Sequence, residues 1–288
     1  MHSPLRALAR LFLFLIGIAY IIPVQLVLNR ISDRAYFHSA MTFLAFCGRT
    51  FGIDVVTHGR ISETRPTLFV INHASYLDII VFGGLVPGAF VAKREVRSWP
   101  FFGFLATLQR NIFIDRRPRY AAGQRDALST RLAEHGNIFL FPEGTSTDGG
   151  RTLPFKSALF SVAEVPVDGK PLVIQPVTIA YVALDGIPLG RHLRPLFTWY
   201  GDMDLLPHVW IMAGLGRLTV AVDFHEPVTL PQFGSRKALA EHCSRVVGAG
   251  LAAELAGRRP ETLARPAAGS DGAAAESPAE EPVNQAVA

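Results

Sequence analysis

The stretch NHASYLD, residues 72–78, directly follows the apolar run LFVI, residues 68–71. A short apolar run of this kind predicts a buried strand. His73 therefore stands at the end of a strand, and a carboxylate, Asp78, follows in the same stretch. An imidazole with a carboxylate beside it can act as a general base with an orienting partner. His73 and Asp78 are therefore the candidate catalytic residues.

The spacing of this pair requires a particular local structure, because positions i and i+5 on a regular helix lie about 140° apart. Ser75 and Asp78 have the spacing of a capping box, which predicts a helix over residues 75–82 with Ser75 as its N-cap. His73 then lies in the loop before the helix, where its ring can turn toward Asp78. The alternative is that Asp78 only caps the helix and His73 is an ordinary loop histidine.

From Thr67 onward, short β-rich runs alternate with helical ones. Alternation of this kind predicts an α/β domain with a largely parallel or mixed sheet flanked by helices, which we assign to residues 56–258. The predicted strands are residues 67–71, 89–92, 111–114, 137–141, 172–182 and 218–224, and the predicted helices are residues 75–82, 101–108, 121–134, 155–162 and 236–256.

The N-terminal part of the chain has the composition of a membrane anchor. Residues 11–29 contain no charged side chain and are flanked by arginines, in a chain that is 49% hydrophobic. Such a run can cross most of a hydrocarbon core of about 30 Å. Pro23 permits a re-entrant or kinked helix as well as a full span, and a cleaved signal peptide is a further alternative. A second apolar stretch, residues 41–51, fits an interfacial helix or a core helix. We therefore expect residues 1–55 to form a membrane-anchoring helical segment.

The rest of the composition narrows the class of partner. Residues 266–288 contain four acidic and no basic side chains, so the remainder is more basic than the overall charge of +4. A basic body beside an apolar anchor suits an anionic lipid surface, and no pattern of nucleic-acid recognition is present. Residues 259–288 are rich in Ala, Pro, Glu and Gly, which predicts a disordered tail. Cys47 and Cys243 lack metal-ligand spacing, so we expect free thiols and no metal site.

Two more polar clusters follow predicted strands. The stretch FPEGTSTDGG, residues 141–150, predicts a rigid turn whose backbone N–H groups, hydroxyls and carboxylate can hold a polar head group, although an ordinary turn would look the same. The stretch FIDRR, residues 113–117, offers Arg116 for a forked contact with phosphate or carboxylate, or for a simple ion pair with Asp115. Ser146 does not complete a G-x-S-x-G nucleophile motif. Open α/β sheets gather their sites at the carboxyl ends of strands, so we expect the clusters to meet.

In order along the chain, NHASYLD, FIDR, FPEGT and IQPV at residues 174–177 resemble the four blocks of the glycerolipid acyltransferase family, which includes lysophosphatidic acid acyltransferases. The resemblance implies that His73 is the general base, that Asp78 holds its ring, and that Arg116 binds the acceptor's head group. It also implies that Glu143, Gly144 and Thr145 shape that binding site. Pro176 would match the fourth block, which serves structure or acyl-donor binding.

The resemblance implies a reaction as well as a fold. A fatty acyl chain would pass from acyl-CoA or acyl carrier protein to the sn-2 hydroxyl of 1-acylglycerol-3-phosphate, without a cofactor, at the cytoplasmic face of a bacterial inner membrane. Ser146 stands where many lysophosphatidic acid enzymes carry a basic residue, and residues 199–208, WYGDMDLLPH, resemble a bacterial branch in which some members acylate lyso-ornithine lipid. The alternatives are therefore acylation of lyso-ornithine lipid, a thioester hydrolase, and a non-catalytic lipid-binding protein.

Overall fold

The computed structural model describes residues 2–114, 132 and 136–258, so most of the helix predicted at residues 121–134 and the whole predicted tail lie outside the described residues. The strands are β1 (Ile53–Gly59), β2 (Thr67–Ile71), β3 (Ala89–Lys93), β4 (Ile112–Ile114), β5 (Ile138–Leu140), β6 (Val173–Leu184), β7 (Ile187–Pro188), β8 (Leu218–Phe224) and β9 (Val228–Thr229). The helices are α1 (Pro4–Leu28), α2 (Asp33–Thr50), α3 (Leu77–Gly83), α4 (Phe102–Leu108), α6 (Leu205–Gly214) and α7 (Arg236–Leu255), and the 3-10 turns are η1 (Arg94–Ser98), η3 (Ser157–Glu164), η4 (Arg194–Leu196) and η5 (Leu230–Gln232).

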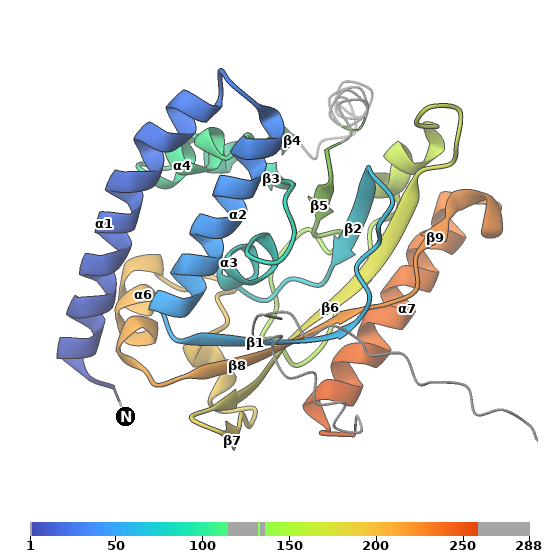
Figure 1. The fold of residues 1–288 in the computed structure, drawn as a ribbon. Coiled ribbons are helices and arrows are strands. Elements are labelled where there is room, and N and C mark those ends of the chain that lie inside the picture. The colour runs from blue at the N-terminus through green and yellow to red at the C-terminus, as the bar shows by residue number, and fades with distance from the viewer. Residues whose placement is uncertain (1, 115–131, 133–135, 259–288) are drawn as a thin grey trace, which may run out of the picture.

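The described strands form one mixed sheet with helices on both of its faces (Figure 1). Its strand order is β1-β8-β6-β2-β5-β3-β4, and β7 and β9 pair with β6. The pairs from β6 through β2, β5 and β3 to β4 are all parallel, whereas β8 runs antiparallel to β6. The carboxyl ends of β2 and β5 therefore lie side by side, as the sequence predicts for a site of this class.

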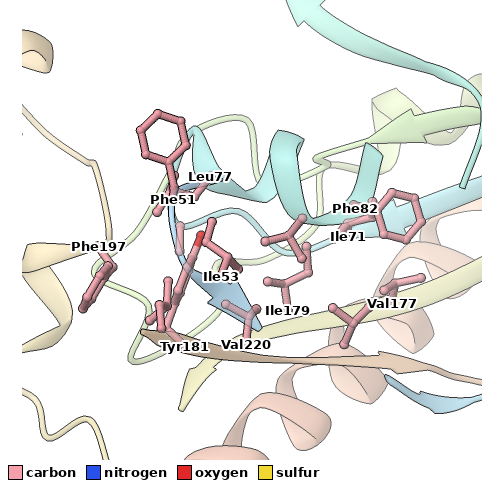
Figure 2. Packing of buried hydrophobic residues seen from close by; sticks show 14 of the residues in the cluster. Phe51, Ile53, Ile71, Leu77, Phe82, Val177, Ile179, Tyr181, Phe197 and Val220 are labelled. Carbon is pink, nitrogen blue, oxygen red and sulfur yellow. The ribbon is translucent and has the colours of Figure 1, made fainter. Parts of the chain in front are cut away.

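Both faces of the central strands are buried, which explains why β2 is a continuous apolar run. Phe69 and Ile71 point into a cluster shared with α3 and α6, and Leu68 and Val70 point into a second cluster shared with α7. Figure 2 shows the first cluster between the sheet and α3. The sheet is thus the middle of three layers, and its central strands are fixed from both sides.

The N-terminal helices form an antiparallel hairpin against one edge of the first cluster (Figure 1). Nε2 of the buried Gln25 in α1 donates to the Ser39 hydroxyl at 2.7 Å and to the Tyr36 carbonyl at 3.3 Å, so the N–H groups of this amide are bonded to α2. The helix α1 continues past Pro23 without a break and is the described helix long and apolar enough to cross a membrane, judged by length and composition. It also packs against α6, so it is held to the sheet domain.

Several predicted elements differ from the observed ones in informative ways. The predicted helix at residues 155–162 is the 3-10 turn η3, and the edge strand β1 was not predicted, because it is only partly buried and carries Asp54, His58 and Gly59. The stretch WYGDMDLLPH, residues 199–208, contains the start of α6. Cys47 and Cys243 are free thiols, as predicted. Both are buried, which raises the pKa of each thiol to about 12.

Candidate active site

The structure brings the predicted pair together in one hydrogen bond. The Nδ1 atom of His73 lies 2.8 Å from Oδ2 of Asp78. The Asp78 carboxylate is fully buried, whereas the His73 side chain keeps 23% of its surface exposed. A buried, ionised carboxylate requires an N–H at Nδ1, so this arrangement leaves Nε2 as the basic nitrogen of a neutral imidazole.

Asp78 also accepts hydrogen bonds from the loop that carries His73. Its Oδ2 accepts from the backbone N–H groups of Ala74 and Ser75 at 2.7 and 2.9 Å, and its Oδ1 accepts from the Tyr181 hydroxyl at 2.6 Å. In Figure 2 the Tyr181 side chain extends from β6 toward the segment of Leu77. Burial, and next the charge of Asp78, raise the pKa of the Tyr181 hydroxyl well above its usual value, so Tyr181 is a stable donor.

The predicted capping box at Ser75 is wrong in detail. The helix α3 begins at Leu77, its N-cap is Tyr76, and no side chain caps it. Asp78 instead turns back onto the N–H groups of the two residues after His73, which form a tight turn. The same carboxylate therefore shapes the loop and orients the imidazole, so the capping and catalytic interpretations of Asp78 are not exclusive.

A second loop, residues 141–153 after β5, is hydrogen-bonded to the backbone of the His73 loop. One oxygen of the buried Glu143 carboxylate accepts from the His73 backbone N–H at 3.0 Å, and the other accepts from Leu153 N–H at 2.9 Å. The His73 carbonyl accepts from Thr147 N–H at 3.0 Å. Burial raises the pKa of Glu143 to about 7, against the two backbone hydrogen bonds, which lower it. Glu143 thus lies beneath the turn and fixes the backbone of His73.

The imidazole plane is set by stacking. The ring of Phe141, the first residue of the second loop, lies 4.2 Å from the His73 ring at an interplanar angle of 17°. The neighbouring Asn72 is buried and exchanges two hydrogen bonds with the Ile179 backbone, which joins the end of β2 to β6. Stacking and these bonds leave the His73 ring little freedom to rotate.

A third segment, residues 189–214, closes the other side of the His73 loop. Trp199 N–H donates to the Ala74 carbonyl at 2.8 Å. His208 is buried and bridges the Tyr76 hydroxyl at 3.0 Å and the Pro195 carbonyl at 3.3 Å. Burial lowers the pKa of His208, so a neutral ring can accept from Tyr76 and donate to Pro195. No spacing pattern along the chain indicates this link, because its partners are far apart in the sequence.

The remaining predicted site residues are placed as follows. Gly144 follows Glu143 in the turn with a φ of +80°, a conformation that favours glycine, and Thr145 is exposed at its surface. Arg116 lies outside the described residues. In the fourth block Gln175 is fully buried, and its side chain bonds three backbone groups, those of Ser62, Arg60 and His225. The fourth block therefore has a structural part in the sheet.

Comparisons with known proteins identify the family of this chain. An acyltransferase family model matches residues 52–180. The lyso-ornithine lipid O-acyltransferase of Brucella abortus is 40% identical over 220 residues, which are 75% of this chain and 82% of that protein. That of Rhizobium meliloti is 39% identical and covers 68% of each chain. A 1-acyl-sn-glycerol-3-phosphate acyltransferase of Neisseria gonorrhoeae is 31% identical over 62% of this chain and 67% of its own.

The fold has a counterpart among crystal structures. The 1-acyl-sn-glycerophosphate acyltransferase of Thermotoga maritima superimposes with a TM-score of 0.65 over 89% of this chain and 97% of that chain, at 24% sequence identity. This likeness concerns the fold, and the sequence relatives carry the family assignment. The chain belongs to the glycerolipid acyltransferase family that includes the lyso-ornithine lipid and 1-acyl-sn-glycerol-3-phosphate acyltransferases.

Proposed function

We propose that this protein transfers a fatty acyl chain from an acyl thioester to the hydroxyl of lyso-ornithine lipid. The observation that carries the chemistry is the hydrogen bond between His73 and the buried Asp78. The acceptor is proposed from the relatives, since lyso-ornithine lipid acyltransferases match at 36% to 40% identity. Ser146, in place of the basic residue of many lysophosphatidic acid enzymes, supports the same acceptor.

In the proposed reaction Nε2 of His73 takes the proton from the acceptor hydroxyl, and the oxygen attacks the thioester carbonyl directly. Asp78 stabilises the imidazolium that forms. The tetrahedral intermediate collapses by breaking its carbon–sulfur bond, and His73 returns the proton to the leaving thiolate. The N–H groups of His73, Ala74 and Ser75 are already bonded to carboxylates, so other backbone N–H groups near these turns would stabilise the oxyanion. The step produces an ester and a free thiol without an acyl-enzyme.

The setting of the reaction follows from its substrates. Both have acyl chains, so the apolar helix α1 serves to keep the site at a bilayer surface and shortens the search for the acceptor. We assign the active site to the cytoplasmic face of a bacterial inner membrane, where a thioester donor, acyl-CoA or acyl carrier protein, is available. Arg116, in the second block, is proposed to contact the polar head group of the acceptor.

A second acceptor is supported by a separate observation. Acyltransferases of 1-acyl-sn-glycerol-3-phosphate from two Neisseria species are 31% and 32% identical to this chain. The same His73 and Asp78 chemistry would acylate the sn-2 hydroxyl of that lipid and give phosphatidic acid. The two acceptors differ in head group and not in the reacting bond, so one assay can compare them.

The test is acyl transfer from labelled acyl-CoA and acyl carrier protein by the purified full-length protein, with each lysolipid in parallel. We expect His73→Ala to lower the rate by about a hundred-fold to ten-thousand-fold, the usual contribution of a general base. His192→Ala removes an exposed histidine and is the matched control. Full activity of the His73 variant would refute the mechanism. Release of free fatty acid without any acylated lipid would indicate a thioester hydrolase instead.

A further inference from the structure

Arg194 lies beside the catalytic loops and is held by its backbone. It opens η4, and its carbonyl accepts from the backbone N–H groups of Phe197 and Thr198, both at 2.9 Å, and from the Thr198 hydroxyl at 3.2 Å. The next residue, Pro195, is tied through His208 to Tyr76. The position of Arg194 is therefore fixed relative to the turn that follows His73.

Two glycines of the second loop bring Arg194 close to that turn. A Cβ atom at Gly149 would lie 3.7 Å from Cβ of Ala74, the residue after His73, and 4.0 Å from Cδ of Arg194. A Cβ atom at Gly150 would lie 3.2 Å from a terminal nitrogen of Arg194 and 3.3 Å from Oδ1 of Asp148. Because these positions lack side chains, the guanidinium lies against the loop at the edge of the catalytic turn.

The guanidinium retains an unused donor. Among the described residues, its Nε atom is buried without a hydrogen-bond partner. A buried donor without a partner costs free energy, and such groups call for a functional explanation. Asp148, on the other side of Gly150, is half-buried, and its Oδ1 accepts from Gly150 N–H at 3.0 Å. One positive and one negative side chain thus flank the same glycine.

We propose that Arg194 and Asp148 form the binding site for a zwitterionic acceptor head group, with the acceptor's carboxylate on Arg194 and its ammonium beside Asp148. This inference rests on the proposed function, since the ornithine head group carries both charges. A guanidinium binds a carboxylate through two parallel hydrogen bonds, which also fix its orientation. Asp148 attracts an ammonium and repels a phosphate, so the pair favours ornithine over glycerol phosphate.

The experiment compares Arg194→Gln, Arg194→Lys and Asp148→Asn with wild type, and uses Arg191→Gln as the control because Arg191 is exposed on the same segment. Asparagine keeps the Oδ1 acceptor for Gly150 and removes only the charge. KM and kcat are measured for lyso-ornithine lipid and 1-acylglycerol-3-phosphate, with the thermal unfolding midpoint as a check on folding. Equilibrium binding of lyso-ornithine lipid is measured separately, without acyl donor.

We expect Arg194→Gln to raise both the KM and the Kd for lyso-ornithine lipid about ten-fold or more, because this is the usual effect of losing a hydrogen bond to a charged group. The value of kcat and the KM for the acyl donor should stay nearly unchanged. Lysine should restore part of the affinity. Asp148→Asn should weaken the binding of lyso-ornithine lipid and leave the binding of 1-acylglycerol-3-phosphate unchanged. The inference would be overturned if the KM and Kd for lyso-ornithine lipid were the same in Arg194→Gln, in Asp148→Asn and in the Arg191→Gln control. If the wild-type protein binds lyso-ornithine lipid but does not acylate it, only the proposed function is refuted. If the wild-type protein does not bind this lipid, both the proposed function and the inference are wrong.

Discussion

At the scale of single residues, Asp78 combines a structural role in its loop with the catalytic role that we propose for it. Its two oxygens accept hydrogen bonds from His73, from two backbone N–H groups and from Tyr181, all while it is fully buried. A buried carboxylate is stable only when its hydrogen-bonding capacity is satisfied. We therefore infer that the buried Tyr181 is a positioning residue, which would act on the imidazole through Asp78.

Removal of the Tyr181 hydroxyl tests this positioning role. In Tyr181→Phe, Oδ1 of Asp78 loses its donor, and we expect the free energy of unfolding to fall by about 1.5–3 kcal/mol. The turn that holds His73 should also loosen, with a loss in kcat of up to roughly a hundred-fold and little change in KM, since misplacement affects the reacting geometry. Steady-state kinetics and denaturant unfolding measure both effects.

Tyr20→Phe is the matched control, because Tyr20 is 69% exposed on α1. It should leave both the stability and kcat at wild-type values. If Tyr181→Phe also keeps the wild-type kcat, Asp78 holds the imidazole without help from the tyrosine, and the positioning role is wrong.

At the scale of elements, the α1 and α2 hairpin depends on a close approach at Gly17. A Cβ atom there would lie 2.6 Å from an edge carbon of the Phe46 ring and 3.2 Å from the Phe43 ring, closer than packed atoms approach. The glycine thus lets α1 lie on two aromatic rings of α2. Close packing of this kind explains how a long apolar helix is fixed to the domain through one stripe while its other side stays exposed.

Gly17→Leu should separate the two helices. Overpacking at a tight contact costs about 1–3 kcal/mol, so we expect a lower unfolding midpoint for the purified protein in detergent. Ala19→Leu places the same side chain on the exposed side of α1 and should leave the midpoint unchanged. Equal midpoints for the two variants would mean that α1 is not packed on α2 in solution.

At the scale of the whole molecule, the apolar surface is concentrated on the elements around α1. Large exposed side chains lie on α1, on α6, which packs against α1, and on the η1 to α4 segment. A face of this kind on a lipid enzyme fits insertion into the acyl region of a bilayer. The exposed large hydrophobic residues of these elements are Leu5, Leu8, Phe12, Leu13, Leu15, Ile16, Tyr20, Leu26, Val27, Trp99, Phe101, Phe104, Leu206, Trp210 and Ile211.

Substitutions on this face should weaken membrane binding without unfolding the protein. Phe12→Ser combined with Leu15→Ser removes two exposed side chains, each worth about 1.5–3 kcal/mol when buried, so binding to vesicles of anionic lipid should fall at least ten-fold. Co-sedimentation measures the bound fraction. Ile61→Ser is the control, because Ile61 is exposed in the loop between β1 and β2 (Figure 1). Equal binding of the double variant and the control would show that α1 does not face the lipid.

The sequence by itself determined the α/β class, the strands β2 and β8 to the residue, and the pairing of His73 with Asp78. Each follows from a local cause: a continuous apolar run marks a strand buried on both faces, and a short turn brings two residues of one loop together. The same reasoning placed three polar clusters at strand ends, and the structure brings the His73 and Glu143 loops together there. Arg116, in the remaining cluster, lies outside the described residues.

Tertiary structure alone decided the contacts that complete the site. Tyr181 is 103 positions from Asp78, and His208 is 132 positions from Tyr76, so no local pattern connects them. Tyr181 reaches Asp78 because its strand, β6, lies beside β2, whereas His208 reaches Tyr76 from the helix α6. The helix α3 also begins at Leu77 and not directly after Ser75, and the Asp78 carboxylate accepts from the N–H groups of Ala74 and Ser75 in the loop before it. Local burial patterns fix elements, and long-range packing fixes which side chains meet.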